Sequence, residues 1–186
     1  PFVDGRPAAP THDGKALLYG GIAFSAIVIA LRVPVSTKLV RVGNPYDAMV
    51  YGNIVNLAGL GAVSTLVVGA VRRGRALAYT DVFENRERRF NAKAMTATGW
   101  TMFGLGMGAF VLSRVFTPLS CDLVNQCDFR ALEGTWYLSF GLIAAGAGLG
   151  SLGLAYGNRA QSYERRISIT PVLDRSRAGL SIGGRF

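Results

Sequence analysis

The sequence predicts an all-α membrane protein with four transmembrane helices and a short C-terminal β-hairpin. Half of its 186 residues are hydrophobic, and the mean hydropathy is +0.30. Charged residues are missing from four long windows and crowded between them, whereas a soluble domain would interleave charges along amphipathic elements. The net charge of +9 comes from Lys and Arg residues that flank these windows, as is typical of membrane helices.

The transmembrane domain is expected over residues 14–157, between an extended leader (1–13) and a polar tail (158–186). The leader holds three prolines and the single histidine, with too little apolar content to form a core. The four spans are placed at about residues 15–31, 48–71, 95–112 and 135–156. The last has 22 residues without a charge, and as a helix it is about 33 Å long, against about 30 Å for the hydrocarbon core of a bilayer.

Prolines are expected to interrupt the helices between these spans. The link 32–47 contains Pro34 and Pro45, so an extended or re-entrant turn is expected there. Pro118 is expected to stop the third helix, because proline lacks the N–H group that a helix interior uses. A loop is therefore expected over residues 116–134.

Two amides mark an interior face of the second span. Asn53 and Asn56 are three residues apart and share a helix side, and lipid offers an amide no hydrogen-bond partner. They form interhelical hydrogen bonds in one interpretation and line a pore or polar cavity in the other.

The segment 72–93, after the second span, is the most charged part of the chain and carries interleaved aromatic residues. It is interpreted as an amphipathic helix on an anionic membrane surface, or alternatively as a rigid continuation of the second span. The expected contacts with anionic lipid headgroups are Arg72, Arg73, Arg75, Arg86, Arg88 and Arg89. A nucleic-acid patch is disfavoured, because no recognised binding fold surrounds it.

Small residues predict where helices pack. In the third span, Gly104 and Gly108 form a GxxxG pair that permits close helix approach. In the fourth span, one face carries four glycines and is expected to be a docking seam: Gly146, Gly150, Gly153 and Gly157. A second small set lies nearly opposite: Gly141, Ala145 and Gly148. The fourth helix is therefore expected to lie between two neighbours, one within the bundle and one beyond it.

Two cysteines lie close together between the third and fourth spans. Cys121 and Cys127 match neither a CxxC pair nor a zinc-ligand spacing with histidines, so no metal site is expected. A small disulfide on an oxidising face is the favoured interpretation, and two unrelated buried thiols are the alternative.

The basic residues predict the orientation. If the N-terminus is cytoplasmic, the inner segments hold two, seven and six of the 20 Lys and Arg residues, against three and two outside. The positive-inside rule then places both termini in the cytoplasm and the cysteines outside. We expect a bacterial inner membrane. A signal peptide removed before Pro1 is the alternative that would invert this topology.

Two segments of the chain resemble each other. Residues 57–66 resemble 144–154, which raises the hypothesis of two repeated helical hairpins.

In the tail, apolar residues recur at every second position. Ile167 and Ile169, and later Leu180 and Ile182, alternate with small or polar residues. This alternation predicts two short strands joined by a turn.

The part from residue 99 to 186 resembles a C-terminal membrane module of myxobacterial cell-envelope proteins. The likeness rests on the glycine-rich helices, the cysteines between them and the tail ITPVLDRSRAGLSIGGRF. It implies a location in the cell envelope and no enzymatic activity. It also implies a tail outside the cytoplasm, in conflict with the charge distribution.

No catalytic residue, cofactor or metal ligand is expected. The middles of the four spans contain no ionisable residue, which argues against proton pumps and most ion-coupled carriers, and no enzymatic motif is present. We expect a non-enzymatic structural or scaffold subunit of a homo-oligomer or a larger envelope complex, in contact with lipids. The alternatives are an oligomeric channel lined by Asn53 and Asn56, and a basic adaptor on the membrane surface.

Overall fold

The computed structural model describes residues 2–3, 6–7, 9–38, 45–84, 90–124, 129–164, 168–174 and 177–183. Its helices are α1 (Lys15–Ser36), α2 (Pro45–Phe83), α3 (Ala92–Val124) and α4 (Phe129–Glu164). Its strands are β1 (Phe2–Val3), β2 (Arg6–Pro7), β3 (Ser168–Asp174) and β4 (Arg177–Gly183).

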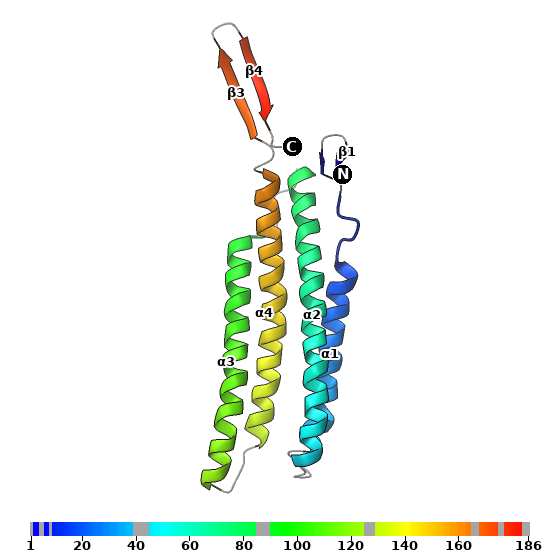
Figure 1. The fold of residues 1–186 in the computed structure, drawn as a ribbon, viewed down its shortest axis with the longest axis vertical. Coiled ribbons are helices and arrows are strands. Elements are labelled where there is room, and N and C mark those ends of the chain that lie inside the picture. Colours follow the sequence, from blue (N-terminus) through cyan, green and yellow to red (C-terminus); the bar gives the residue numbers. More distant parts are fainter. Residues whose placement is uncertain are drawn as a thin grey trace.

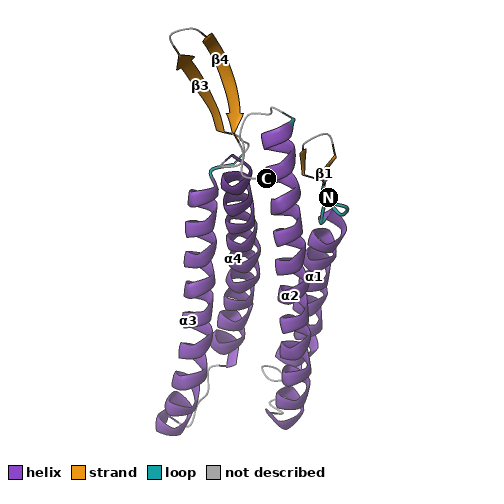
Figure 2. Cartoon of the chain, turned by 45° about the horizontal axis from the view of Figure 1, so that its top comes forward, coloured by secondary structure: helices purple, strands orange, loops and turns teal. Residues whose placement is uncertain are grey.

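The helices run in alternating directions, so α1 begins and α4 ends at the same end of the structure (Figure 1). α1 packs on α2, α2 on α4 and α4 on α3, with little contact between α1 and α4 (Figure 2). We call the end with Arg75 and Arg159 the arginine-rich end, and the end with Arg32 and Glu133 the ion-pair end. A duplicated hairpin would give this arrangement, with α2 and α4 as the inner helices, but the duplication itself stays a prediction.

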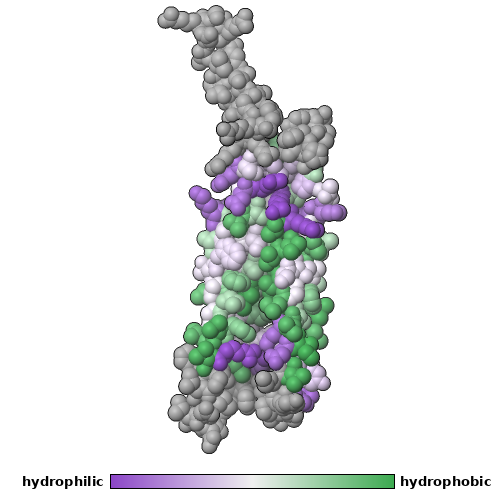
Figure 3. All heavy atoms as spheres, in the orientation of Figure 1, coloured by the Kyte–Doolittle hydropathy of each residue, from purple (hydrophilic) through white to green (hydrophobic). Residues whose placement is uncertain are grey.

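Four helical stretches are long and apolar enough to cross a membrane, which confirms this part of the prediction: Lys15–Ser36, Val50–Phe83, Ala92–Val115 and Leu132–Glu164. Large apolar side chains on these helices face outward, and Tyr19, Leu57, Leu105 and Leu138 are each more than 60% exposed. Figure 3 shows hydrophobic residues over the middle of the visible face and hydrophilic residues toward both ends.

Three helix ends differ from the prediction. α1 continues through Pro34 to Ser36, α3 continues past Pro118 to Val124, and α4 begins at Phe129. The expectations of a non-helical segment directly after residue 31 and of a loop over 116–134 were therefore wrong. A proline removes one helical hydrogen bond, and this single loss does not end α1: beyond Pro34, the Thr37 N–H still donates to the carbonyls of Val33 and Pro34.

α2 and α4 extend beyond α3 at the arginine-rich end (Figure 1). The Tyr79 and Phe83 rings of α2 pack against Tyr163 of α4, with ring centroids 6.1 Å and 5.2 Å away. Buried Asp81 accepts a hydrogen bond of 2.9 Å from the Tyr156 hydroxyl. Residues up to Phe83 thus continue the second helix rigidly, and the interpretation as a separate surface helix was wrong for them.

The strands form two antiparallel pairs outside the helices. β1 pairs with β2, and β3 pairs with β4 in a register that places Ile169 opposite Ile182. Two strands without a third are only marginally stable. The C-terminal hairpin as an independent folded element therefore stays a prediction.

Glycines bring α3 and α4 into direct backbone contact. A Cβ built on Gly99 would collide with the backbone of Gly150, and one on Gly146 with the backbone of Phe103. Farther along, a Cβ on Gly153 would lie 2.8 Å from the Thr96 nitrogen. The seam predicted on the fourth helix therefore packs on α3 of the same chain.

The remaining helix contacts also depend on glycines. In the α1–α2 pair, a Cβ on Gly21 would lie 2.6 Å from the Leu66 backbone, and one on Gly69 would collide with the backbone of Leu18. On the other side of α4, a Cβ on Gly148 would lie 2.9 Å from the Leu66 side chain of α2. α4 thus has a neighbour on each side, and both belong to the same chain.

Substitution of Gly99 tests this packing. We expect Gly99→Leu to reduce the free energy of unfolding in SDS by about 2 kcal/mol or more, because overpacking forces the two backbones apart. Gly141→Leu is the matched control on the partner helix α4, since a Cβ there meets nothing within 4 Å. Equal losses in the two variants would contradict the assignment of the seam.

Candidate functional site

A buried ion pair joins α1 and α4 at the ion-pair end. Arg32 Nε donates to Glu133 Oε2 at 2.8 Å, and Arg32 Nη2 donates to Oε1 at 2.5 Å. Each of the two side chains is 5% exposed. The bidentate geometry satisfies both carboxylate oxygens, which is the strong form of such a pair.

Polar and aromatic groups surround this pair and form the ion-pair cluster with it. The Ser36 hydroxyl donates to Glu133 Oε2 at 2.9 Å and lies 3.0 Å from the Tyr137 hydroxyl. The Arg32 guanidinium carbon lies 4.7 Å from the centroid of the Trp136 ring, within cation–π range. These residues come from two adjacent turns of α1 and α4, so helix geometry alone brings each set together.

A glycine of α2 makes room for the cluster. A Cβ on Gly52 would lie 3.1 Å from Arg32 Nη1, so a larger residue would press on the guanidinium. The Trp136 indole N–H donates to Asn56 Oδ1 at 2.9 Å, which extends the network to α2. The cluster therefore connects three of the four helices.

The sequence analysis missed this cluster because it placed the ends of each transmembrane span at the nearest charged residues. Arg32 directly follows the first apolar window, and Glu133 lies two residues before the last one, so the sequence pattern places both outside the spans. The two are 101 residues apart in sequence, and no helical spacing relates them. The absence of ionisable residues holds only for the middles of the spans, because the helices extend over Arg32 and Glu133.

The cluster has the properties of a structural connection. Arg32 and Glu133 neutralise each other, and Ser36 occupies a further position on the carboxylate. Within the described ranges, no group of three or more His, Cys, Asp or Glu side chains could hold a metal ion.

The two asparagines are not brought together in one cavity. An apolar groove of about 360 Å³ lies between α2, α3 and α4, lined by Asn56, Gly59, Leu60, Val63, Ser64, Phe103, Met107, Phe110, Trp136, Phe140 and Ile143. The amide oxygen of Asn56 is engaged by Trp136. Asn53 is exposed and lies outside this lining, so a pore lined by both asparagines stays a prediction.

The predicted lipid-contacting arginines differ in their surroundings. Arg72 is exposed, whereas Arg73 lies 3.5 Å from the carboxylate of Asp13 in the leader. The Lys15 backbone N–H, which donates to Asp13 at 3.0 Å, and the cations Lys15 and Arg73 hold the pKa of Asp13 below its ordinary value. Arg75 lines a groove between α2 and α4. Arg86, Arg88 and Arg89 lie outside the described residues.

Other predicted site residues fall in three groups. Gly146, Gly150, Gly153 and Gly157 all face α3, where Gly150 would bring a Cβ to 3.3 Å from the Trp100 ring. A Cβ on Gly104 or Gly108 would meet nothing within 4 Å, so none of the described residues packs against their GxxxG face. The predicted disulfide of Cys121 and Cys127 lies outside what the structure describes, because Cys127 falls in an undescribed range.

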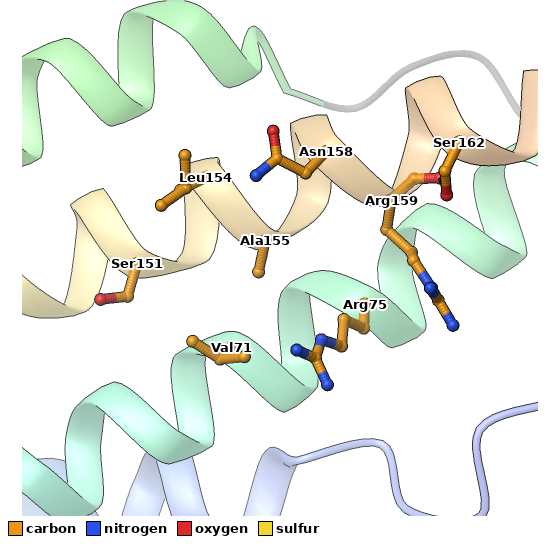
Figure 4. Close-up of a pocket in the computed structure, with 8 residues that line it drawn as sticks. All are labelled: Val71, Arg75, Ser151, Leu154, Ala155, Asn158, Arg159 and Ser162. Atoms are coloured by element: carbon orange, nitrogen blue, oxygen red, sulfur yellow. Dashed lines mark hydrogen bonds between the residues drawn. The ribbon is translucent and has the colours of Figure 1, made fainter.

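The arginine groove lies between α2 and α4 at the arginine-rich end and has a volume of about 370 Å³. Its lining consists of Val71, Arg75, Ser151, Leu154, Ala155, Asn158, Arg159 and Ser162 (Figure 4). Arg159 was not among the predicted site residues. It lies on a different helix from Arg75, and only the fold brings the two into one groove.

Comparison with family models, curated proteins and solved structures gives no match to the chain.

Removal of one partner of the ion pair tests its structural role. We expect Glu133→Leu to lower the free energy of unfolding in SDS by about 3–5 kcal/mol, because Arg32 would remain buried and uncompensated. The double variant Arg32→Met with Glu133→Leu should lose much less, since no unpaired charge remains. A double variant as unstable as the single one would contradict this explanation.

Proposed function

We propose that the chain is an integral membrane protein that acts, without enzymatic activity, as a structural subunit of an oligomeric or multi-protein envelope complex. The observation that carries this proposal is the outward face of α3. Gly104 and Gly108 are exposed there, and a Cβ on either would meet nothing within 4 Å.

Membrane insertion is supported by the apolar exterior of the helices. Soluble monomers rarely expose contiguous apolar patches larger than a few hundred Å². Here large apolar side chains are exposed on all four helices, including Ile27, Leu60, Leu112 and Leu138. A lipid environment accounts for this exposure along the helices.

The proposed orientation places the arginine-rich end in the cytoplasm of a bacterial cell, with the protein in the inner membrane. The segments at this end hold most of the Lys and Arg residues, in agreement with the positive-inside rule. Cys121 and Cys127 would then lie on the oxidising side, where their disulfide would persist. The predicted C-terminal hairpin would lie in the cytoplasm.

The glycines on the outer face of α3 are best explained by a partner helix. Glycine in a helix interior costs about 1 kcal/mol relative to alanine, and a glycine that faces lipid gains no packing in return. A second helix that approaches closely would contact the α3 backbone at Gly104 and Gly108. Among the four apolar stretches, that of α3 also has the smallest buried share, 11% against 50% for α4.

A second copy of the chain is the partner that we propose. The apolar groove adjoins the glycine face, because Met107 lines the groove and lies between Gly104 and Gly108 in sequence. A helix docked on the glycines would also cover part of this groove. The channel hypothesis has less support, since the amide of Asn56 is held by Trp136 and Asn53 does not line the groove.

Leucine substitutions on the α3 face test the assembly. We expect the wild-type protein to form an oligomer and the variant Gly104→Leu with Gly108→Leu to dissociate at least about tenfold more readily, because two side chains block the close approach. Native mass spectrometry in mild detergent measures the oligomer distribution.

The matched control is Gly20→Leu with Gly141→Leu, which adds the same side chains at open positions of α1 and α4. We expect this control to keep the wild-type distribution. An unchanged distribution in the α3 variant, or equal dissociation in both variants, would refute an interface at Gly104 and Gly108.

A further inference from the structure

We propose that the arginine groove binds the phosphate headgroup of an anionic phospholipid, with an acyl chain along its apolar side. The site combines charge from two helices with an apolar wall. This proposal rests on the membrane insertion proposed above and does not depend on assembly, because all the lining residues belong to one chain.

Two guanidinium groups supply the positive charge. Arg159 extends from α4 toward α2, which carries Arg75 (Figure 4). Among the described residues, no carboxylate lies within ion-pair distance of either arginine. A phosphate between them would accept hydrogen bonds from both and reduce the repulsion between two like charges.

One of these arginines is held in place before any ligand arrives. Arg159 Nε donates to the Tyr163 hydroxyl at 3.2 Å, and its guanidinium carbon lies 5.2 Å from the Tyr163 ring centroid. Tyr163 itself is 4% exposed and packs in the aromatic contact between α2 and α4. Asn158 adds a neutral hydrogen-bond donor to the same lining, whereas the Ser162 hydroxyl donates to the Arg159 carbonyl at 2.8 Å.

The opposite part of the groove is mostly apolar, with Ser151 as a polar lining residue. Val71, Leu154 and Ala155 line it below the arginines, toward the apolar middle of the helices. A Cβ on Gly74 would lie 2.6 Å from the Leu152 carbonyl oxygen, so the two helices touch directly beside the groove. A soluble phosphate would leave the apolar wall uncovered, whereas a phospholipid would cover it and place its headgroup at the arginines.

A lipid-binding measurement on the whole protein tests this site. Protein in mild detergent is titrated with phosphatidylglycerol, and the bound lipid is counted on the protomer by native mass spectrometry. We expect Arg75→Gln with Arg159→Gln to weaken binding about 30-fold, and phosphatidylcholine to bind far more weakly than phosphatidylglycerol to the wild-type protein.

The matched control removes the same charge at the same end but outside the groove. Lys15→Gln with Lys93→Gln changes two exposed residues that do not line it, and we expect binding within about twofold of wild type. Equal loss in the two double variants would show a diffuse charge effect and overturn the proposal. Displacement of the lipid by inorganic phosphate at equal concentration would also overturn it in favour of a soluble ligand.

A second variant distinguishes a loss of lipid binding from misfolding. Asn158→Glu keeps both arginines and adds a carboxylate at an exposed lining position next to Arg159, where its negative charge would repel a phosphate in the groove. We expect binding about fivefold weaker than wild type with unchanged helical circular dichroism. Wild-type affinity in this variant would contradict a phosphate position between Arg75 and Arg159.

Discussion

Close contact between helix backbones is the constraint on which the rest of the structure depends. Association of apolar helices gains little from the hydrophobic effect in lipid, because lipid tails are as apolar as leucine side chains. The attraction must then come from dense packing, which glycine permits. Gly99 against Gly150 and Gly21 against Leu66 provide this contact in the α3–α4 and α1–α2 pairs. Gly74 does the same between the two inner helices, where Gly148 also leaves room for the Leu66 side chain.

The ion-pair cluster supplies a connection that glycine packing leaves out. α1 packs mainly on α2 and touches α4 only slightly, so Arg32 and Glu133 give α1 a direct link to the centre of the structure. Burial of two charges has a large desolvation cost, and such a pair is stabilising only when further polar groups complete it. Ser36 and Trp136 provide those contacts. The pair therefore fixes how α1 lies against α4 more than it raises overall stability.

The number of apolar helices could be predicted because absence of charge over a bilayer thickness is a property of each segment alone. The helix ends could not, since Arg32 is compatible with a buried helix only through Glu133, which is 101 residues away. Glycine spacing showed that Gly146 and Gly150 share a face, but spacing does not say which helix packs there. The sequence predicted Arg75 as a lipid contact. Arg159 could be assigned to the same site only from the fold, which places both residues in the lining of one groove.

The two ends of the structure use arginine in opposite ways. At the ion-pair end, Arg32 is 5% exposed on its side chain, and its charge is neutralised by a carboxylate of the same chain. At the arginine-rich end, Arg75 and Arg159 are exposed and have no carboxylate partner among the described residues. A guanidinium group that is paired with a carboxylate of the same protein has few hydrogen-bond donors free for a ligand. A guanidinium group without a carboxylate partner, next to an apolar wall, attracts an anion that carries a hydrophobic tail. The pairing of Arg32 with Glu133 thus connects helices at the ion-pair end. At the arginine-rich end, Arg75 and Arg159 have no such partner among the described residues, and this is why we propose the lipid site there.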